Sequence, residues 1–180
     1  MKIVAFSTSN SKQSINKKLV CYAARVLEET YPGTSVEIID INDYEMPLFS
    51  VDREAVLGHP DEAKAFYKKL GEADALIISH AEHNGSYTAA FKNLFDWTSR
   101  IDVKVFQGKP TVLLATSPGK GGAQTVLKAA AVSAPHFGAD LKASLSLPTF
   151  YDIFSIKQNT LNDELADTKL RTALATVFPA

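Results

Sequence analysis

Short apolar runs alternate with longer segments of helical spacing along the whole chain. The strand-like runs are residues 3–6, 36–41, 75–79, 111–115 and 141–147. Apolar residues recur every three or four positions, as on one face of a helix, in residues 15–27, 63–70, 89–97, 126–134 and 165–177. Strand followed by helix, repeated along the chain, predicts an α/β fold in which a five-stranded parallel sheet has helices on both faces.

The composition of the strand-like runs indicates their order in the sheet. Residues 3–6, 75–79 and 111–115 are almost entirely apolar, as strands buried on both faces are. Residues 36–41 and 141–147 mix or alternate polar residues with apolar ones, which indicates strands outside the centre. A strand order of 2-1-3-4-5 with right-handed crossovers satisfies both observations, and its switch point lies between the first and third strands.

Length, charge and cysteine content narrow the class of protein. A chain of 180 residues with 46% hydrophobic content suits one domain, residues 1–180. Its net charge of −1 gives no reason to expect nucleic acid or a membrane as a partner. No apolar run resembles a signal peptide or a membrane span, so we expect a cytoplasmic protein. Cys21 is the single cysteine, which excludes a disulfide within the chain.

The segment from Ser7 to Asn16, Ser-Thr-Ser-Asn-Ser-Lys-Gln-Ser-Ile-Asn, links the first strand to the first helix. Its hydroxyl and amide side chains, with the N–H groups of a helix N-terminus behind them, suit a phosphate. Taken alone, the segment is better explained as a polar loop that only caps the helix than as a phosphate site. The predicted topology puts it beside the switch point, and phosphate binding by Ser9, Ser14 and Asn16 then becomes the favoured interpretation.

Two further loops are expected at the same edge of the sheet. Residues 80–86 follow the third strand, and residues 116–122 follow the fourth. Their glycines allow the backbone to approach a flat ligand closely and leave amide donors pointing inward. The three loops together predict a nucleotide site, with the phosphate in the first loop and a planar ring across the other two.

Other chemistries fit these loops poorly. The sequence His-Ala-Glu-His at residues 80–83 is one residue short of a His-x-x-Glu-His metal motif and lies on a predicted loop, so we expect no metal. Residues 117–121 lack the Gly-Lys-Ser/Thr ending of a nucleoside-triphosphate loop. Neither Cys21 nor any serine has a base and an orienting carboxylate in an adjacent loop, which leaves nucleophilic hydrolysis without support.

Three motifs occur in and beside these loops at a distinctive spacing. Residues 8–16 read Thr-Ser-Asn-Ser-Lys-Gln-Ser-Ile-Asn, residues 81–97 contain Ala-Glu-His-Asn and Phe-Lys-Asn-Leu-Phe-Asp-Trp, and residues 117–122 read Ser-Pro-Gly-Lys-Gly-Gly. With these motifs the chain resembles the NADPH-dependent FMN reductase family, whose members include quinone, chromate and azo-dye reductases. Ser11 stands where that family has Arg, Ala81 where it has Pro, and His83 where it has Tyr.

The resemblance implies a three-layer flavodoxin-like fold with bound FMN. It implies an enzyme that passes hydride from NADPH or NADH through the flavin to a small acceptor, such as a quinone, free flavin, azo compound or metal oxyanion. The flavin would carry the chemistry, so no catalytic side chain is expected. The cofactor-binding residues that the resemblance implies are Ser9, Ser11, Ser14, Ile15, Asn16, Ala81, Glu82, His83, Asn84, Gly85, Ser117, Gly119, Gly121 and Gly122.

Two other functions use the same kind of fold. A flavodoxin-like electron carrier exchanges electrons with large partners without oxidising NAD(P)H, but carriers usually present a strongly acidic face, against which the net charge of −1 argues. A flavin-free protein could use the same loops for a phosphate-bearing regulator. The first alternative predicts a flavin that NADPH does not reduce, and the second predicts a colourless protein.

The third helical segment, residues 89–97, is apolar on nearly every side, as a helix covered by other segments or by a second subunit would be. We expect a homodimer or homotetramer whose interface includes this helix around Leu94 and Trp97. The apolar loop from Met46 to Phe49 is expected to cover part of the molecule and to form a wall of the site.

Overall fold

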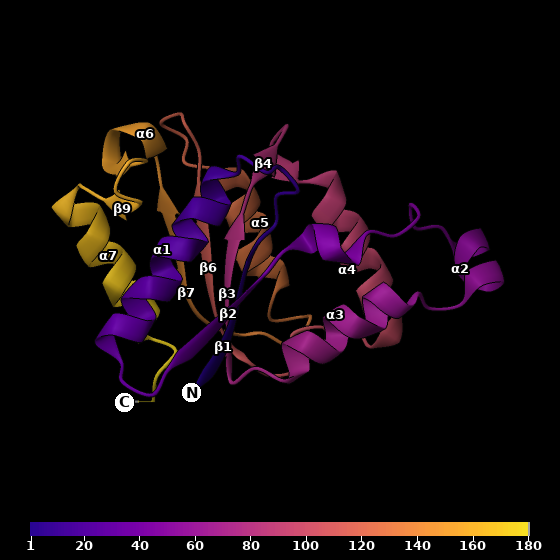
Figure 1. Ribbon diagram of the computed structural model, residues 1–180. Coiled ribbons are helices and arrows are strands. Elements are labelled where there is room, and N and C mark those ends of the chain that lie inside the picture. The colour runs from indigo at the N-terminus through magenta and orange to yellow at the C-terminus, as the bar shows by residue number, and fades with distance from the viewer. Residues whose placement is uncertain (180) are drawn as a thin grey trace.

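The computed structural model describes residues 1–179 and contains a five-stranded parallel sheet. Its strands lie in the order β2-β1-β3-β6-β7, which is the predicted order 2-1-3-4-5 of the main strands (Figure 1). Parallel pairing joins every neighbouring pair in this sheet. The strands are β1 (Lys2–Ser7), β2 (Ser35–Ile39), β3 (Ala75–His80), β6 (Pro110–Thr116) and β7 (Asp140–Leu147).

Helices cover both faces of the sheet and complete three layers (Figure 1). Helices α1 (Ile15–Thr30) and α7 (Glu164–Ala175) pack on one face. Helices α3 (Asp61–Gly71), α4 (Ala89–Ile101) and α5 (Gln124–Ser133) pack on the other. The five long helices that the apolar spacing predicts are therefore all present.

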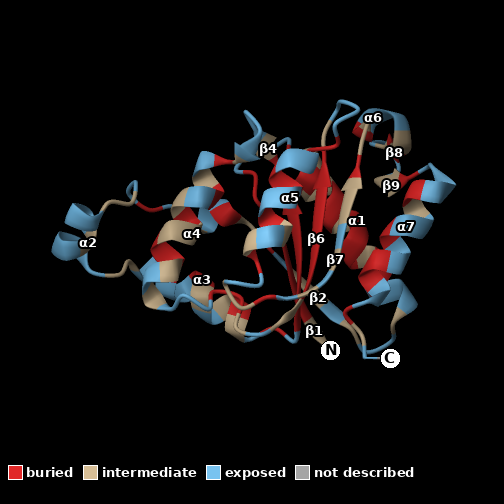
Figure 2. Cartoon of the chain, turned by 180° about the vertical axis from the view of Figure 1, so that it is seen from behind, coloured by how far each residue is buried: buried red, intermediate tan, exposed pale blue. Residues whose placement is uncertain are grey.

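Strand β1 shows why the core lies on both faces. Val4 and Phe6 belong to the cluster under α3, α4 and α5, whereas Ile3 and Ala5 belong to the cluster under α1 and α7. Neighbouring side chains of a strand point to opposite faces, so an unbroken apolar run fills both layers. The central strands β1, β3 and β6 are buried along nearly their whole length (Figure 2), and the observed strand order confirms their predicted central position.

Several short elements have no periodic signal and are absent from the prediction. The second strand ends at Ile39, two residues early, because the Asp40 carboxylate accepts from Asn42 N at 3.0 Å and begins a 3₁₀ turn, η1 (Ile41–Tyr44). His80 is the last residue of β3 and not the start of a loop. The other short elements are α2 (Val51–Leu57), β4 (Glu82–His83), β5 (Ser86–Tyr87), α6 (Phe150–Ile153), β8 (Phe154–Ser155) and β9 (Thr160–Leu161).

The expected subunit interface at the helix around Leu94 and Trp97 stays a prediction, but these two side chains themselves face the interior of their own chain. Both are buried within the chain, because the loop from Met46 to Phe49 lies over α4. Trp97 Nε1 donates to Pro47 O at 2.7 Å, and the Trp97 and Phe49 rings meet edge to face at 5.0 Å. This loop does cover apolar surface, as its composition suggests, and the covered surface belongs to its own chain.

Helix α2 extends away from the body of the molecule, at the right of Figure 1 and the left of Figure 2. None of its residues is buried. Glu54 on α2 accepts from Arg100 Nε on α4 at 2.9 and 3.0 Å, and this ion pair ties the helix to the body. Across residues 1–179, no helix combines the length and apolar content that crossing a membrane requires.

Candidate functional site

A pocket of about 250 Å³ opens at the carboxyl edge of the sheet, beside the switch point between β1 and β3. The three predicted loops meet around it, together with α6, which follows β7. Its lining residues are Ser9, Gln13, Ser14, Ile15, Asn16, Ala81, Glu82, His83, Thr116, Ser117, Pro118 and Tyr151. The fold therefore brings segments more than a hundred residues apart to one small site.

Serine hydroxyls shape the β1–α1 loop by accepting from the backbone two residues ahead. Ser7 Oγ accepts from Ser9 N, Ser9 Oγ from Ser11 N, and Ser11 Oγ from Gln13 N, each at 3.2 Å. Ser14 then caps α1, because its hydroxyl accepts from Lys17 N at 3.1 Å. These serines make the turn without glycine, and Ser11 itself is exposed on the outside of the loop.

The first turn of α1 offers free donors to the pocket. Within residues 1–179, the N–H groups of Ile15 and Asn16 donate to no protein acceptor. The helix dipole places partial positive charge at the same point, and the first turn contains no acidic residue. This end of α1 has the donors and the electrostatic sign that an anion requires.

Of the two lysines near this end of α1, Lys17 and Lys12, only Lys12 has a charge that is not already paired within the described protein. Lys17 pairs with Asp40, and the hydrogen bond that its ammonium group donates to that carboxylate raises the pKa of Lys17. Its charge is therefore largely compensated inside the protein. Lys12 is exposed at the tip of the loop and forms no ion pair among the described residues. Lys12 is thus the free cation of this loop.

The Asn16 side chain joins three elements beneath the pocket. Its Oδ1 accepts from Ser79 Oγ at 2.8 Å and from Thr116 N at 3.1 Å, while its Nδ2 donates to Thr116 O at 3.1 Å. Asn16 is only 3% exposed, so these bonds form away from water. Three hydrogen bonds thus hold the amide within the protein, and the backbone N–H and the second Nδ2 hydrogen of Asn16 have no acceptor among the described residues.

The β4–β5 hairpin forms a second wall of the pocket. Asn84 and Gly85 both have positive φ, of 53° and 73°, as a two-residue hairpin turn of this hand requires. Ala81 N donates to Thr8 Oγ1 at 2.9 Å, which ties the start of the hairpin to the β1–α1 loop. Glu82 Oε2 accepts from Val126 N at 2.8 Å, in the first turn of α5, which ties it to the glycine-containing loop.

The loop after β6 forms the third wall. Gly122 has φ of +58°, and a side chain there would come within 2.3 Å of Ser146 Oγ, so this glycine is required by packing. Gly119 and Gly121 have open space where a side chain would begin, so the described protein leaves room above them. Phe150 N donates to Ser117 O at 3.0 Å, and this bond brings α6 and Tyr151 to the pocket.

The structure distributes the predicted site residues between the pocket and its surroundings. Those that line the pocket are Ser9, Ser14, Ile15, Asn16, Ala81, Glu82, His83 and Ser117. Those outside the lining are the exposed Ser11, Asn84, Gly85, Gly119 and Gly121 and the buried Gly122.

Sequence reasoning missed four lining residues, namely Gln13, Thr116, Pro118 and Tyr151. The first three belong to the loops already chosen. Tyr151 follows the carboxyl end of the fifth predicted strand, which the topology places at the same edge. Its position after that strand could therefore have identified it as a residue of the pocket.

His80 and His83 do not share a site. His83 is exposed and lines the pocket at the sheet edge, whereas His80 is buried and lines a different cavity between α4 and α5. Among residues 1–179, no three His, Cys, Asp or Glu side chains gather in an arrangement that could hold a metal ion.

Comparison with known proteins agrees with this architecture. Residues 1–150 match the family described as NADPH-dependent FMN reductase, and the chain belongs to this family. It is 34% identical over 125 residues to an NADPH:quinone oxidoreductase of Arabidopsis thaliana, and 34% identical over 122 residues to an NAD(P)H-dependent FMN reductase of Pseudomonas aeruginosa. These matches cover 69% and 68% of this chain but only 62% and 63% of the two relatives.

A solved structure supports the fold over a greater length. The flavoenzyme NAD(P)H:(acceptor) oxidoreductase FerB from Paracoccus denitrificans superposes with a TM-score of 0.77 at 22% identity. The superposition covers 98% of this chain and 94% of that protein. The flavodoxin-like fold predicted from the sequence is therefore confirmed.

The position of Asn16 generates the first prediction. Asn16→Ala removes three buried hydrogen bonds and leaves the Thr116 backbone unpaired, so the free energy of unfolding should fall by about 2–4 kcal/mol. Urea unfolding followed by circular dichroism measures it. Asn162→Ala is the matched control, because that exposed side chain forms no hydrogen bond in the described residues. Equal stability of the two variants would contradict a clamp at Asn16.

Proposed function

We propose that this chain is an FMN-dependent NAD(P)H oxidoreductase that passes hydride from NADPH or NADH through bound FMN to a small acceptor. The acceptor class comprises quinones, free flavins, azo compounds and metal oxyanions. The observation that carries the proposal is the free N-terminus of α1 at the switch point of a chain in this family. The two relatives are named for quinone reduction and FMN reduction, and these activities support the same class.

The residues around α1 fit the phosphate end of FMN. The N–H groups of Ile15 and Asn16 are free, and the hydroxyls of Ser9 and Ser14 line the same pocket. Lys12 supplies the positive charge that the family's arginine would otherwise bring, since Ser11 occupies that position. This donor set is neutral or cationic throughout, which suits a phosphate.

The rim of the pocket fits a planar ring. A volume of about 250 Å³ lies just below the range of about 300–1,000 Å³ that is usual for ligand pockets, so part of a nucleotide would lie outside it. The exposed backbone at Asn84–Gly85 and at Gly119–Gly121 borders that outer part. Tyr151, 61% exposed, adds an aromatic face at the same rim.

The protein's own part in this reaction is binding and orientation. When bound, FMN supplies the hydride chemistry. Glu82 is committed to Val126 N and holds the hairpin at a set distance from the glycine-containing loop. The backbone donors of the two loops hold the ring in place and favour negative charge on it. No side-chain acid or base is assigned.

The electron carrier remains the second candidate function. It uses the same FMN site but accepts no hydride from NAD(P)H. The net charge of −1, from 19 basic and 20 acidic residues, argues against the strongly acidic face that carriers usually present to a redox partner, which favours the reductase.

Anaerobic mixing with NADPH tests the reductase directly. The purified protein should bind FMN and show flavin absorbance, and mixing with NADPH or NADH in a stopped-flow instrument should bleach it. Adding a quinone such as menadione should then restore the absorbance. A stable flavin spectrum after mixing would identify an electron carrier, and failure to take up FMN would contradict both flavin functions.

The free cation of the first loop generates another prediction. Lys12→Glu should weaken FMN binding roughly tenfold at low salt, and by less at high salt, because screening reduces the effect of an exposed charge. Fluorescence quenching of added FMN measures the dissociation constant. Lys169→Glu is the matched control, since it makes the same change of charge on the distant helix α7. Equal affinities for the two variants would place the phosphate away from Lys12.

The assembly of the protein is a separate proposal. We infer a homodimer or homotetramer in which the arm formed by Leu48 and α2 contacts a second copy. Leu48, Val51, Val56 and Leu57 are 55–83% exposed, and a helix of seven residues is too short to be stable without packing. Two-fold pairing of identical copies would cover both arms at once, which supports a second copy as the occupant.

Sedimentation velocity tests the arm. The double variant Val51→Glu, Val56→Glu should sediment as a monomer at concentrations where the unmodified protein is oligomeric. Val132→Glu is the matched control, because Val132 on α5 has the same 72% exposure as Val51. A monomeric unmodified protein would contradict the assembly, and dissociation by Val132→Glu alone would move the interface to α5.

A further inference from the structure

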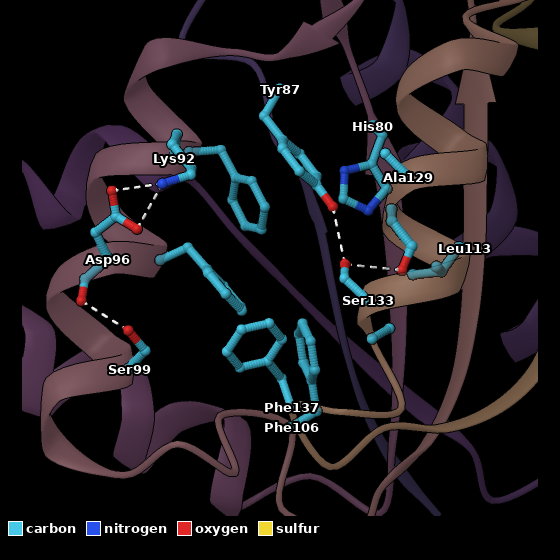
Figure 3. Close-up of a pocket in the computed structure, with 14 residues that line it drawn as sticks. His80, Tyr87, Lys92, Asp96, Ser99, Phe106, Leu113, Ala129, Ser133 and Phe137 are labelled. Carbon is cyan, nitrogen blue, oxygen red and sulfur yellow. Dashed lines mark hydrogen bonds and ion pairs between the residues drawn. The ribbon is translucent and has the colours of Figure 1, made fainter.

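A second cavity, of about 320 Å³, lies between α4 and α5 (Figure 3). The β4–β5 hairpin stands between this cavity and the pocket at the sheet edge. The cavity shares no lining residue with that pocket. Four phenylalanines line it, namely Phe91, Phe95, Phe106 and Phe137. The centroids of the Phe95 and Phe137 rings lie 4.7 Å apart in an edge-to-face arrangement.

His80 is the unusual residue of this cavity. It is 2% exposed, and neither Nδ1 nor Nε2 has a hydrogen-bond partner among the described residues. Its ring meets Tyr87 at 5.7 Å and Phe91 at 5.5 Å, so its neighbours are aromatic. Buried polar atoms are nearly always paired, and an unpaired one facing a cavity points to a missing partner.

The cavity carries little net charge. Burial lowers the pKa of His80 to about 3, so the imidazole is neutral at physiological pH, with one nitrogen free to accept. Lys92 and Asp96, at the α4 side of the cavity, pair with each other at 2.7 Å and cancel. Tyr87 Oη and Ser133 Oγ lie 3.1 Å apart and form the other polar point. A charged ligand would find no compensating charge inside.

We propose that this cavity binds an uncharged aromatic molecule with a hydroxyl group, of the phenol or hydroquinone class, whose O–H donates to the unpaired imidazole of His80. The ring would pack against the phenylalanines, with edge-to-face contacts of the kind they already make. A second hydroxyl on the ligand could meet the Tyr87–Ser133 pair. A volume of about 320 Å³ accepts a one- or two-ring molecule and is far larger than a single water needs.

This inference does not depend on the proposed reductase activity. The site is built from α4, α5 and the inner side of the hairpin, and it contains none of the residues placed around the nucleotide pocket. Binding should therefore be the same with and without FMN, which distinguishes this cavity from an acceptor site over the flavin.

Fluorine NMR titration provides the test, with 4-fluorophenol as the probe and fluorobenzene as the matched ligand without a donor. 4-Fluorophenol should bind the apoprotein and the FMN-loaded protein equally, and about tenfold more tightly than fluorobenzene, as one additional hydrogen bond allows. His80→Leu should reduce the affinity for 4-fluorophenol about tenfold and change that for fluorobenzene less than twofold. His136→Leu, which changes an exposed histidine, should alter neither.

A second variant keeps the test decisive where His80→Leu does not fold. Ala129 lines the cavity from α5 and is exposed, so Ala129→Phe should fill the space and abolish binding of both probes without touching the core. Three results would overturn the inference: no binding of 4-fluorophenol at millimolar concentration, unchanged affinity in His80→Leu, or loss of binding on loading FMN. Absence of binding, with dissociation of an oligomer by Ala129→Arg, would assign the cavity to an interface between two copies.

Discussion

The buried amide of Asn16 is the constraint on which the nucleotide pocket depends. It comes from the first turn of α1 and bonds to Ser79 on β3 and to the Thr116 backbone on β6, so it connects the two sides of the switch point. The strands β1 and β3 stay paired at this point, but the loops that follow them open a crevice, because the neighbouring crossovers leave toward opposite faces of the sheet. The side-chain amide of Asn16 fills this crevice and, through its hydrogen bonds, holds the three strand ends together. The backbone N–H groups of Ile15 and Asn16 at the start of α1 stay free. The anion site therefore exists because the cleft beneath it is closed by hydrogen bonds.

A second set of hydrogen bonds fixes the walls of the pocket. Thr8 holds the start of the hairpin, Glu82 holds the first turn of α5, and Ser117 holds α6. Each bond joins two different loops, so the loops cannot move independently without losing a buried or half-buried partner. Such cross-bracing is what a site needs if it is to orient a large planar cofactor with backbone groups alone. Glu82 takes part in this cross-bracing, because its carboxylate accepts from Val126 N.

The end of β3 divides the molecule into two chemical environments. Ala81, Glu82 and His83 line the polar pocket at the sheet edge, while His80 and Tyr87 line the aromatic cavity between α4 and α5. The hairpin separates the two, since its turn residues reverse the chain within a few positions. One short segment therefore lines both the pocket proposed for a charged nucleotide and the cavity proposed for a neutral aromatic molecule.

By itself, the sequence determined the strand order, the three loops at the sheet edge and most residues that line the pocket. These features depend on local periodicity and on whether a strand is apolar on one face or two, and both are written in neighbouring residues. Only the tertiary structure decided how the side chains are used. The Asn16 amide hydrogen-bonds to Thr116, 100 positions away, and Trp97 hydrogen-bonds to Pro47, 50 positions away. The same holds for Tyr151 and for the unpaired His80, because burial and pairing between distant segments have no signature in a local pattern.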